Sequence, residues 1–278
     1  MSALYRHRWL LARRACQLGI LALFAFGAPY VKGTLASSMT LGVLPLTDPF
    51  VLLQSLAAGH MPIKAGWIGA AIVALFYALL GGRAYCGWVC PVNLLTDLAG
   101  WLRRVLGLND KALLLPRQTR LWIMAAALAV SALTGTIAWE AVNPVTLLQR
   151  GLTFGLPLGI LAGAAVLLVD LTAGARTWCG HLCPVGAFYG LLGRFSLLRF
   201  SAKGRSLCDD CGDCYRVCPE PHCLSPALRG EARGIGPLVA SGDCSLCGRC
   251  ADVCSKDVLA ASLRLQSNST SVKGECPP

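Results

Sequence analysis

Two runs of closely spaced cysteines near the C-terminal end have the residue type and spacing for redox chemistry. In each run the four cysteines are separated by two, two and three residues. This is the spacing of bacterial ferredoxins that hold two 4Fe–4S clusters, in which the fourth cysteine of each run reaches the other cluster. The predicted ligands of cluster I are Cys208, Cys211, Cys214 and Cys254. The predicted ligands of cluster II are Cys244, Cys247, Cys250 and Cys218.

Zinc is the alternative occupant of such cysteines. Zinc sites usually separate Cys-x-x-Cys pairs by a dozen or more residues, whereas these runs are uninterrupted, which favours iron–sulfur clusters. Residue 255 is Ser where the ferredoxin pattern has Pro, but this change removes no ligand. Cys223 and Cys276 fall outside the pattern and are interpreted as unligated thiols.

Four other cysteines form two Cys-x-x-x-Cys-Pro motifs, at Cys86 and Cys90 and at Cys179 and Cys183. A separation of four residues places two thiols on one face of a helix. If the motifs meet, their four thiolates could form a third redox or metal site, because that is the ligand number of an iron–sulfur cluster or a closed zinc site. The alternative is two pairs of reduced cysteines at helix ends, each followed by a terminating proline.

The motifs belong to an internal repeat. The segment 83–92 recurs at 176–185, and the segment Asp-Pro-x-x-Leu-Leu-Gln at 48–54 recurs with Asn in place of Asp at 143–149. The offsets are 93 and 95 residues, so one small gap aligns both segments. Both halves enter from the same side, which predicts a parallel repeat about an axis near the membrane normal.

The composition indicates a membrane protein. Of the 278 residues, 55% are hydrophobic and 14% are charged, whereas a soluble domain has about a quarter charged residues. Four runs without Asp, Glu, Lys or Arg are each about long enough to cross a hydrocarbon core of roughly 30 Å; they are residues 15–31, 65–82, 121–139 and 151–169. The shorter apolar stretches 33–47 and 49–59 are expected to be interfacial or re-entrant.

The fold class predicted from these features is a membrane α-helical protein. It has four transmembrane helices in two parallel repeats, followed by a small two-cluster ferredoxin-like domain. The predicted segments are a cytoplasmic N-terminus (1–14), membrane repeat 1 (15–96), a cytoplasmic connector (97–120), membrane repeat 2 (121–200), the 4Fe–4S domain (201–265) and a flexible tail (266–278).

The net charge of +11 follows the positive-inside pattern, because Arg and Lys flank the apolar runs. We therefore expect a multi-pass protein of the bacterial inner membrane with both termini in the cytoplasm, and no binding of nucleic acid. The aromatic residues Tyr85, Trp88 and Trp178 are interpreted as part of an interfacial belt.

Paired 4Fe–4S clusters attached to membrane spans are expected to exchange electrons with a membrane-soluble donor, and a quinol is the natural one. Quinol oxidation also releases two protons. Carboxylates and imidazoles near the span ends are the candidate proton acceptors, although solvated or helix-end roles are the plainer interpretation. These residues are Asp48, His60 and Glu140 on the outer side and Asp97 and Asp170 on the inner side.

The four spans, the two Cys-x-x-x-Cys-Pro motifs and the C-terminal two-cluster module resemble the NapH family of ferredoxin-type membrane proteins. Cys-Pro-Glu-Pro at 218–221 and Cys-Ser-Lys-Asp at 254–257 also look like that family. The resemblance implies a quinol dehydrogenase component that passes electrons toward periplasmic nitrate reductase. It also implies a periplasmic polyferredoxin partner and, in some organisms, a membrane tetrahaem cytochrome.

Two alternative functions are open at this point. The first is a membrane polyferredoxin that reduces copper or helps to activate a respiratory, nitrous oxide or methylamine enzyme. Copper handling would favour Met and His pairs near the Cys-Pro motifs, but the chain has only four Met. The second is a redox-sensing membrane anchor that recruits partner proteins.

Overall fold

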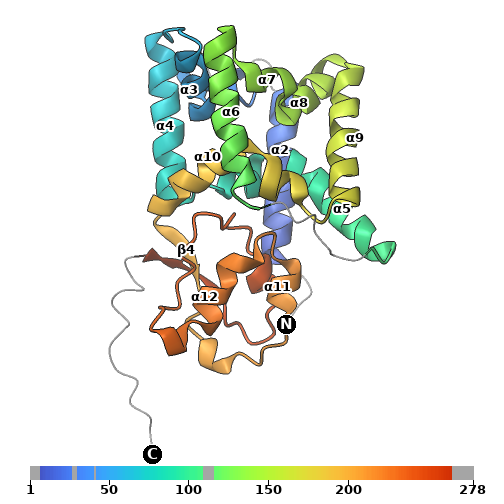
Figure 1. The fold of residues 1–278 in the computed structure, drawn as a ribbon, viewed down its shortest axis with the longest axis vertical. Helices are drawn as coiled ribbons and strands as arrows, with labels where there is room; N and C mark the ends of the chain where they lie inside the picture. Colours follow the sequence, from blue (N-terminus) through green and yellow to red (C-terminus); the bar gives the residue numbers. More distant parts are fainter. Residues whose placement is uncertain (1–6, 27–29, 41, 109–115, 265–278) are drawn as a thin grey trace, which may run out of the picture. The chain divides into compact units, whose positions relative to one another are not determined.

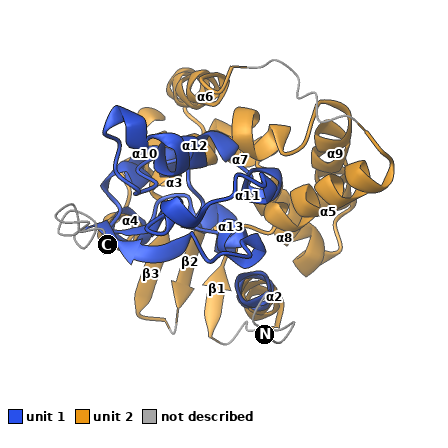
Figure 2. Ribbon diagram, turned by 90° about the horizontal axis from the view of Figure 1, so that it is seen from below, with its two compact units in different colours: residues 1–15, 77–88, 189–278 blue, residues 16–76, 89–188 orange. Residues whose placement is uncertain are grey.

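The computed structural model describes residues 7–26, 30–40, 42–108 and 116–264 (Figure 1). It divides into two compact units, which Figure 2 distinguishes by colour. Unit 1 consists of residues 1–15, 77–88 and 189–278, and unit 2 consists of residues 16–76 and 89–188. The predicted segment boundaries therefore differ from the observed ones, because segments distant in the sequence pack together in unit 1. The predicted tail (266–278) lies outside the described residues.

Unit 2 is largely helical. Its long apolar helices are α2 (Arg8–Phe26, which begins in unit 1), α4 (Lys64–Leu80, which ends in unit 1), α6 (Thr119–Thr134) and α9 (Pro157–Thr172). Its other helices are α3 (Pro49–Ala57), α5 (Val92–Val105), α7 (Ala138–Val142), α8 (Pro144–Phe154), η2 (Trp178–Leu182) and the start of α10 (Pro184–Leu192). Helix α5 crosses residue 96, so that predicted boundary falls inside a helix.

Among the described residues, one helix, Arg8–Phe26, has both the length and the composition to cross a membrane. The apolar helices α4, α6 and α9 have 16 or 17 residues. The predicted run 151–169 is wrong as a single helix. Helix α8 ends at Phe154, Gly155 has a left-handed backbone (φ 66°), and Pro157 begins α9. Glycine after a helix and proline at the first helical position are standard stop and start residues, so this run is divided.

The stretch 33–47, which the sequence analysis expects to be interfacial or re-entrant, contains short strands. It forms most of a three-stranded antiparallel sheet in the order β1-β2-β3, with β1 at Val31–Gly33, β2 at Ser37–Thr40 and β3 at Leu44–Thr47. The register pairs Lys32 with Met39 and Ser38 with Leu46. Each strand has only three or four residues, and pairing between neighbouring strands holds them in place. The hydropathy along the sequence does not reveal such pairing.

The repeated Asx-Pro motif starts a helix in both repeats. Asp48 accepts a hydrogen bond from the Phe50 backbone N at 2.9 Å, and Asn143 accepts one from Val145 N at 3.1 Å. An Asx N-cap followed by proline is a strong helix start, because the side chain satisfies a free N–H and proline needs none.

The glutamine that ends each copy of the motif is buried and bonds to a distant backbone. Gln54 Oε1 accepts from Trp139 N at 3.0 Å, and Gln149 Oε1 accepts from Leu35 N at 2.8 Å. Each copy thus ties its helix to the segment preceding the helix of the other copy. The two halves of the repeat therefore have matching local structure within unit 2.

Unit 1 contains the cysteine runs. Its elements after residue 192 are η3 (Gly193–Phe195), β4 (Leu198–Ser201), η4 (Arg205–Leu207), α11 (Asp213–Val217), η5 (Pro221–Cys223), α12 (Leu224–Arg229), η6 (Glu231–Arg233), α13 (Arg249–Val253) and β5 (Ala260–Leu263). The antiparallel pair β4–β5 closes this part, with Leu198 opposite Leu263, so the domain begins before the predicted residue 201. The turn η1 (Tyr85–Val89) begins in this unit.

The two cysteine runs have the same backbone conformation. Gly212 (φ 79°) precedes α11 and Gly248 (φ 72°) precedes α13, and the residues two positions earlier, Asp210 and Leu246, are also left-handed. The glycines differ in their surroundings. A Cβ on Gly248 would lie 2.3 Å from the Trp9 ring, whereas a Cβ on Gly212 would meet nothing within 4 Å.

This difference predicts unequal effects of one substitution. Gly212→Ala should cost about 1–2 kcal/mol of unfolding free energy, because alanine is strained in the left-handed region. Gly248→Ala should cost about 1–3 kcal/mol more, because its methyl group overlaps Trp9. The measurement is thermal denaturation of the purified full chain in detergent. Adding Trp9→Ala to Gly248→Ala should remove most of the difference; equal losses at the two glycines would contradict the packing described here.

Candidate metal centres

The first cysteine cavity is formed by the loop before α11 and the chain after α13. Cys208 follows η4, Cys214 lies on α11 and Cys254 is the residue that ends α13. These three and Cys211 all line one cavity. Cys211 is exposed, so this cavity has an open edge. The four predicted ligands of cluster I are thus brought together although Cys254 is far from the others in the sequence.

The second cavity is the counterpart formed by the other run. Cys244, Cys247 and Cys250 line it together with Cys218 from the first run. Cys247 and Cys250 are buried. The exchange of the fourth cysteine between the runs is the arrangement that the spacing predicted.

The sulfur environments suit a group that binds thiolates. Burial raises the pKa of Cys214, Cys218 and Cys250, and it raises the pKa of Cys244 to about 11. Without a bound group these thiols are therefore neutral near pH 7, and binding iron must displace their protons. Four sulfur donors around each cavity, with no other ligand type required, fit a 4Fe–4S cluster. In the described residues, no three His, Cys, Asp or Glu side chains are grouped so as to hold a single metal ion.

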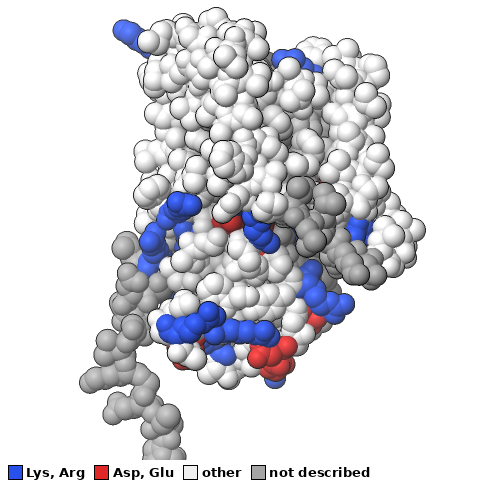
Figure 3. Space-filling view, in the orientation of Figure 1, with Lys and Arg blue, Asp and Glu red and all other residues white. Residues whose placement is uncertain are grey.

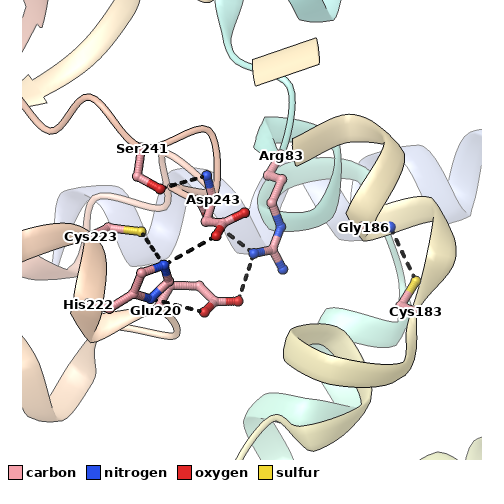
Figure 4. A network of polar contacts seen from close by, with 8 residues as sticks. All are labelled: Arg83, Cys183, Gly186, Glu220, His222, Cys223, Ser241 and Asp243. Carbon is pink, nitrogen blue, oxygen red and sulfur yellow. Dashed lines mark hydrogen bonds and ion pairs between the residues drawn. The ribbon is translucent and has the colours of Figure 1, made fainter. Parts of the chain in front are cut away.

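A buried ion pair lies beside the second cavity (Figure 4). Arg83 NH1 donates to Glu220 Oε1 at 2.7 Å and to the Asp243 carbonyl at 3.2 Å. Glu220 follows Cys218 by two residues and Asp243 immediately precedes Cys244. One guanidinium group therefore joins the two chain segments that carry ligands from different runs.

A histidine and a cysteine complete this network. His222 Nε2 lies 3.2 Å from Asp243 Oδ2, and its Nδ1 lies 3.6 Å from Glu220 Oε2 (Figure 4). Cys223 Sγ lies 3.6 Å from His222 Nε2 and Cys223 also lines the second cavity. Burial raises the pKa of Cys223 to about 12, so its thiol is neutral. The sequence does not predict this network. Its two residues that stand in sequence motifs are Arg83, in the repeat, and Glu220, in Cys-Pro-Glu-Pro.

Two of the aromatic residues assigned to an interfacial belt, Trp88 and Tyr85, have specific partners in unit 1, and their place relative to a membrane stays a prediction. Trp88 Nε1 donates to the Leu246 carbonyl at 3.0 Å, and its ring meets Trp9 edge to face at 6.1 Å. Tyr85 is buried and stacks on Tyr189 at 4.8 Å. Packing between segments distant in the sequence fixes where these rings lie within unit 1.

The cysteines of the two Cys-Pro motifs lie at matching places. Cys86 is in η1 and Cys179 is in η2, and both turns are π-helical, a rare form frequent at functional sites. Cys90 and Cys183 follow the turns, and Cys183 Sγ accepts from Gly186 N at 3.4 Å (Figure 4). Cys86 belongs to unit 1 and the other three belong to unit 2. The third site therefore stays a prediction.

The three outer proton-acceptor candidates have structural partners within unit 2. Asp48 is a helix N-cap, and His60 Nε2 lies 2.9 Å from the Gly135 carbonyl. The Glu140 carboxylate accepts hydrogen bonds from Asn143 Nδ2 at 2.8 Å and from Thr146 Oγ1 at 2.7 Å. These contacts support the plainer interpretation of helix-end residues.

The two inner candidates differ from each other. Asp97 pairs with Arg176 at 2.7 Å. Asp170 is fully buried, and its Oδ1 accepts a hydrogen bond at 2.8 Å from the backbone N of Trp178, the residue before Cys179.

Comparison with known proteins assigns iron–sulfur domains to three segments of the chain. A family model described as "4Fe-4S binding domain" matches twice, at residues 64–109 and 154–203, which are the two halves that carry the Cys-Pro motifs. A "4Fe-4S dicluster domain" matches residues 207–258, which hold both cysteine runs. No solved structure matches.

Curated relatives cover nearly the whole chain. The methylamine utilization ferredoxin-type protein MauN of Paracoccus denitrificans is 54% identical over 86% of this chain and 84% of its own length. The MauN of Methylorubrum extorquens is 51% identical over 94% and 91% of the two chains. The ferredoxin-type protein NapH of Escherichia coli is 45% identical over 95% of this chain and 93% of its own.

The ligand assignment predicts which cysteine substitutions remove iron. Cys250→Ala should remove the spectroscopic signal of cluster II and lower the iron content by up to about four atoms per chain. Cys223→Ala is the matched control, because Cys223 lines the same cavity outside the ligand pattern. The measurement is iron and acid-labile sulfide in anaerobically purified protein. Loss of iron in the control, or full iron in Cys250→Ala, would contradict the assignment.

Proposed function

Because this chain belongs to the family of ferredoxin-type proteins that includes NapH and MauN, we propose that it is a membrane-bound component that takes electrons from quinol. Ferredoxin-type iron–sulfur electron transfer is its general activity. The observation that carries the proposal is the pair of cavities in unit 1, each lined by four predicted ligand cysteines. When bound there, 4Fe–4S clusters supply one-electron redox chemistry.

The residues of this chain would hold the clusters and control their surroundings. Cys211 is exposed at the open edge of the first cavity, so that edge is accessible to an electron-transfer partner. Two of the four ligand cysteines of the second cavity, Cys247 and Cys250, are buried, and Glu220 of the Arg83–Glu220 pair lines this cavity. Trp88 and Trp9 pack beside the Leu246 loop and exclude water from that side.

The surface of unit 2 supports a membrane location. Large apolar side chains are exposed on its helices, and in Figure 3 these helices carry few charged residues whereas Lys, Arg, Asp and Glu gather on unit 1. Examples are Leu133 at 86% exposed and Ile160 at 78%. A continuous exposed apolar surface of this kind marks contact with a membrane or another protein. We propose four spans with both termini in the cytoplasm, in the bacterial inner membrane.

The proposed acceptor side follows from the resemblance to the NapH family. Electrons would pass toward a periplasmic nitrate reductase, with a periplasmic polyferredoxin and a membrane tetrahaem cytochrome as partners. Methylamine utilization is the second candidate, since the MauN relatives are 54% and 51% identical and the NapH relative is 45% identical. Purification of the chain in mild detergent distinguishes the two candidate functions by the protein that co-purifies with it. That protein belongs to nitrate reduction in the first case and to methylamine oxidation in the second.

The quinol role predicts reduction of the clusters by quinol. Adding decyl-ubiquinol or menadiol to anaerobic membranes that contain the chain should produce the electron paramagnetic resonance of reduced 4Fe–4S clusters. Membranes containing Cys250→Ala should lose the part of that signal due to cluster II. If dithionite reduces the clusters rapidly and neither quinol does, the chain has another electron donor.

A third centre at the Cys-Pro motifs predicts further iron. The double variant Cys86→Ser, Cys179→Ser should contain less iron per chain than the wild type while keeping the signals of clusters I and II. Cys16→Ser is the control, because Cys16 is outside all the motifs. Unchanged iron together with an unchanged visible spectrum would exclude the third centre.

A further inference from the structure

Asp170 is a buried carboxylate of unit 2 with one oxygen that makes no hydrogen bond among the described residues. It lies near the end of α9 and is 0% exposed. Its Oδ1 accepts from Trp178 N at 2.8 Å, but its Oδ2 has no hydrogen-bond donor among the described residues. A buried carboxylate oxygen is unfavourable without a donor, and ionisable groups in membrane helices usually mark functional sites.

The internal repeat shows that the local fold does not need this carboxylate. With the offset that aligns the Cys-Pro motifs, Asp170 corresponds to Tyr77 and Trp178 corresponds to Tyr85. In the first repeat these two positions meet as aromatic rings, 5.7 Å apart and edge to face. The same junction between an apolar helix and a π-helical turn is therefore built once with two tyrosines and once with a buried carboxylate.

The neighbouring cations do not satisfy the free oxygen. Arg103 NH1 donates to the backbone carbonyls of Asp170 and Leu171, and Arg176 NH2 pairs with Asp97. Arg103 and Arg176 are close enough to influence the charge of Asp170. The titratable groups on the elements packed against α9 are Asp97, Arg103 and Arg104 on α5, Arg150 on α8, and Cys179 and His181 on η2.

We propose that Asp170 Oδ2 accepts one of the two protons of a quinol that is oxidised where α9 leads into η2. This inference rests on the proposed function and adds a catalytic residue to it. A quinol dissolves in the apolar part of a membrane, and its hydroxyl group can donate a hydrogen bond and then a proton to a carboxylate oxygen. The outward side of α9 exposes Leu161 and Leu168, which match an isoprenoid tail.

The step is balanced as follows in atoms and electrons. Each quinol loses two O–H bonds and becomes quinone. Its two electrons leave singly to the iron–sulfur acceptors of the chain. Asp170 Oδ2 takes one of the two protons, which stays on it while the quinone is bound, and solvent takes the other.

The test uses the full chain in lipid nanodiscs with decyl-ubiquinol and menadiol as probes. Asp170→Asn keeps an oxygen that accepts from Trp178 N but is a poor base. We expect its quinol-dependent cluster reduction to be about 100-fold slower, within the range for loss of a general base. Iron content and reduction by dithionite should not change. Thr172→Val, which removes an exposed hydroxyl two residues later, should keep the wild-type rate.

A second variant and a second readout separate the outcomes. Asp170→Tyr introduces the residue of the first repeat and should fold, yet be as slow as Asp170→Asn. Infrared difference spectra should show a carboxylic acid band on addition of quinol to wild type, absent from both variants. A wild-type rate in Asp170→Asn, or a band that persists in it, would overturn the proposal. Failure of both quinols to reduce the wild type would instead refute the proposed function.

Discussion

Burial of polar groups among apolar side chains is the constraint that organises both units. In unit 2, Gln54 and Gln149 are buried, and each uses its side-chain oxygen to accept from a distant backbone N–H, that of Trp139 at the start of α7 and that of Leu35. In unit 1, Arg83 is buried and is compensated by Glu220. A buried ion pair of this kind contributes little net stability, but breaking it leaves an unpaired charge, so it fixes which chain segments lie together. The cysteine cavities obey the same rule, because their desolvated thiols need iron to become favourable thiolates.

The internal repeat explains how one architecture serves two tasks. Arg83 and Arg176 occupy equivalent positions in the repeat, yet Arg83 pairs with Glu220 of the cluster domain and Arg176 pairs with Asp97 of α5. The arginine of the first copy therefore pairs with the segment that carries the cysteine runs. The arginine of the second copy pairs with a helix of unit 2. Tyr77 and Asp170 differ at equivalent positions in the same way. Where two copies of one structure diverge, the difference reflects function more than folding.

The spacing of the cysteine runs predicts that Cys218 and Cys254 exchange between the sites, and the structure places them at opposite cavities. Their roles as cluster ligands stay a prediction. The prediction failed where structure depends on pairing between distant segments. The sheet at 31–47 and the packing of Trp88 against the Leu246 loop leave no periodic signal in the hydropathy. The run 151–169 lacks charge throughout, so charge alone does not reveal the break, which Gly155 and Pro157 produce.

The two cluster sites have the same ligand spacing and unequal surroundings. Gly212 is open on the side where a Cβ would project, while the equivalent face of Gly248 is covered by Trp9. Cys211 is exposed, while its counterpart Cys247 is buried. Solvent access and nearby charge both set the potential of an iron–sulfur cluster, so identical ligands would not give identical centres. The covering residues, Trp9 and Trp88, come from the same segments that lead into the apolar helices. The two sites therefore differ in solvent access although their ligand spacing is the same.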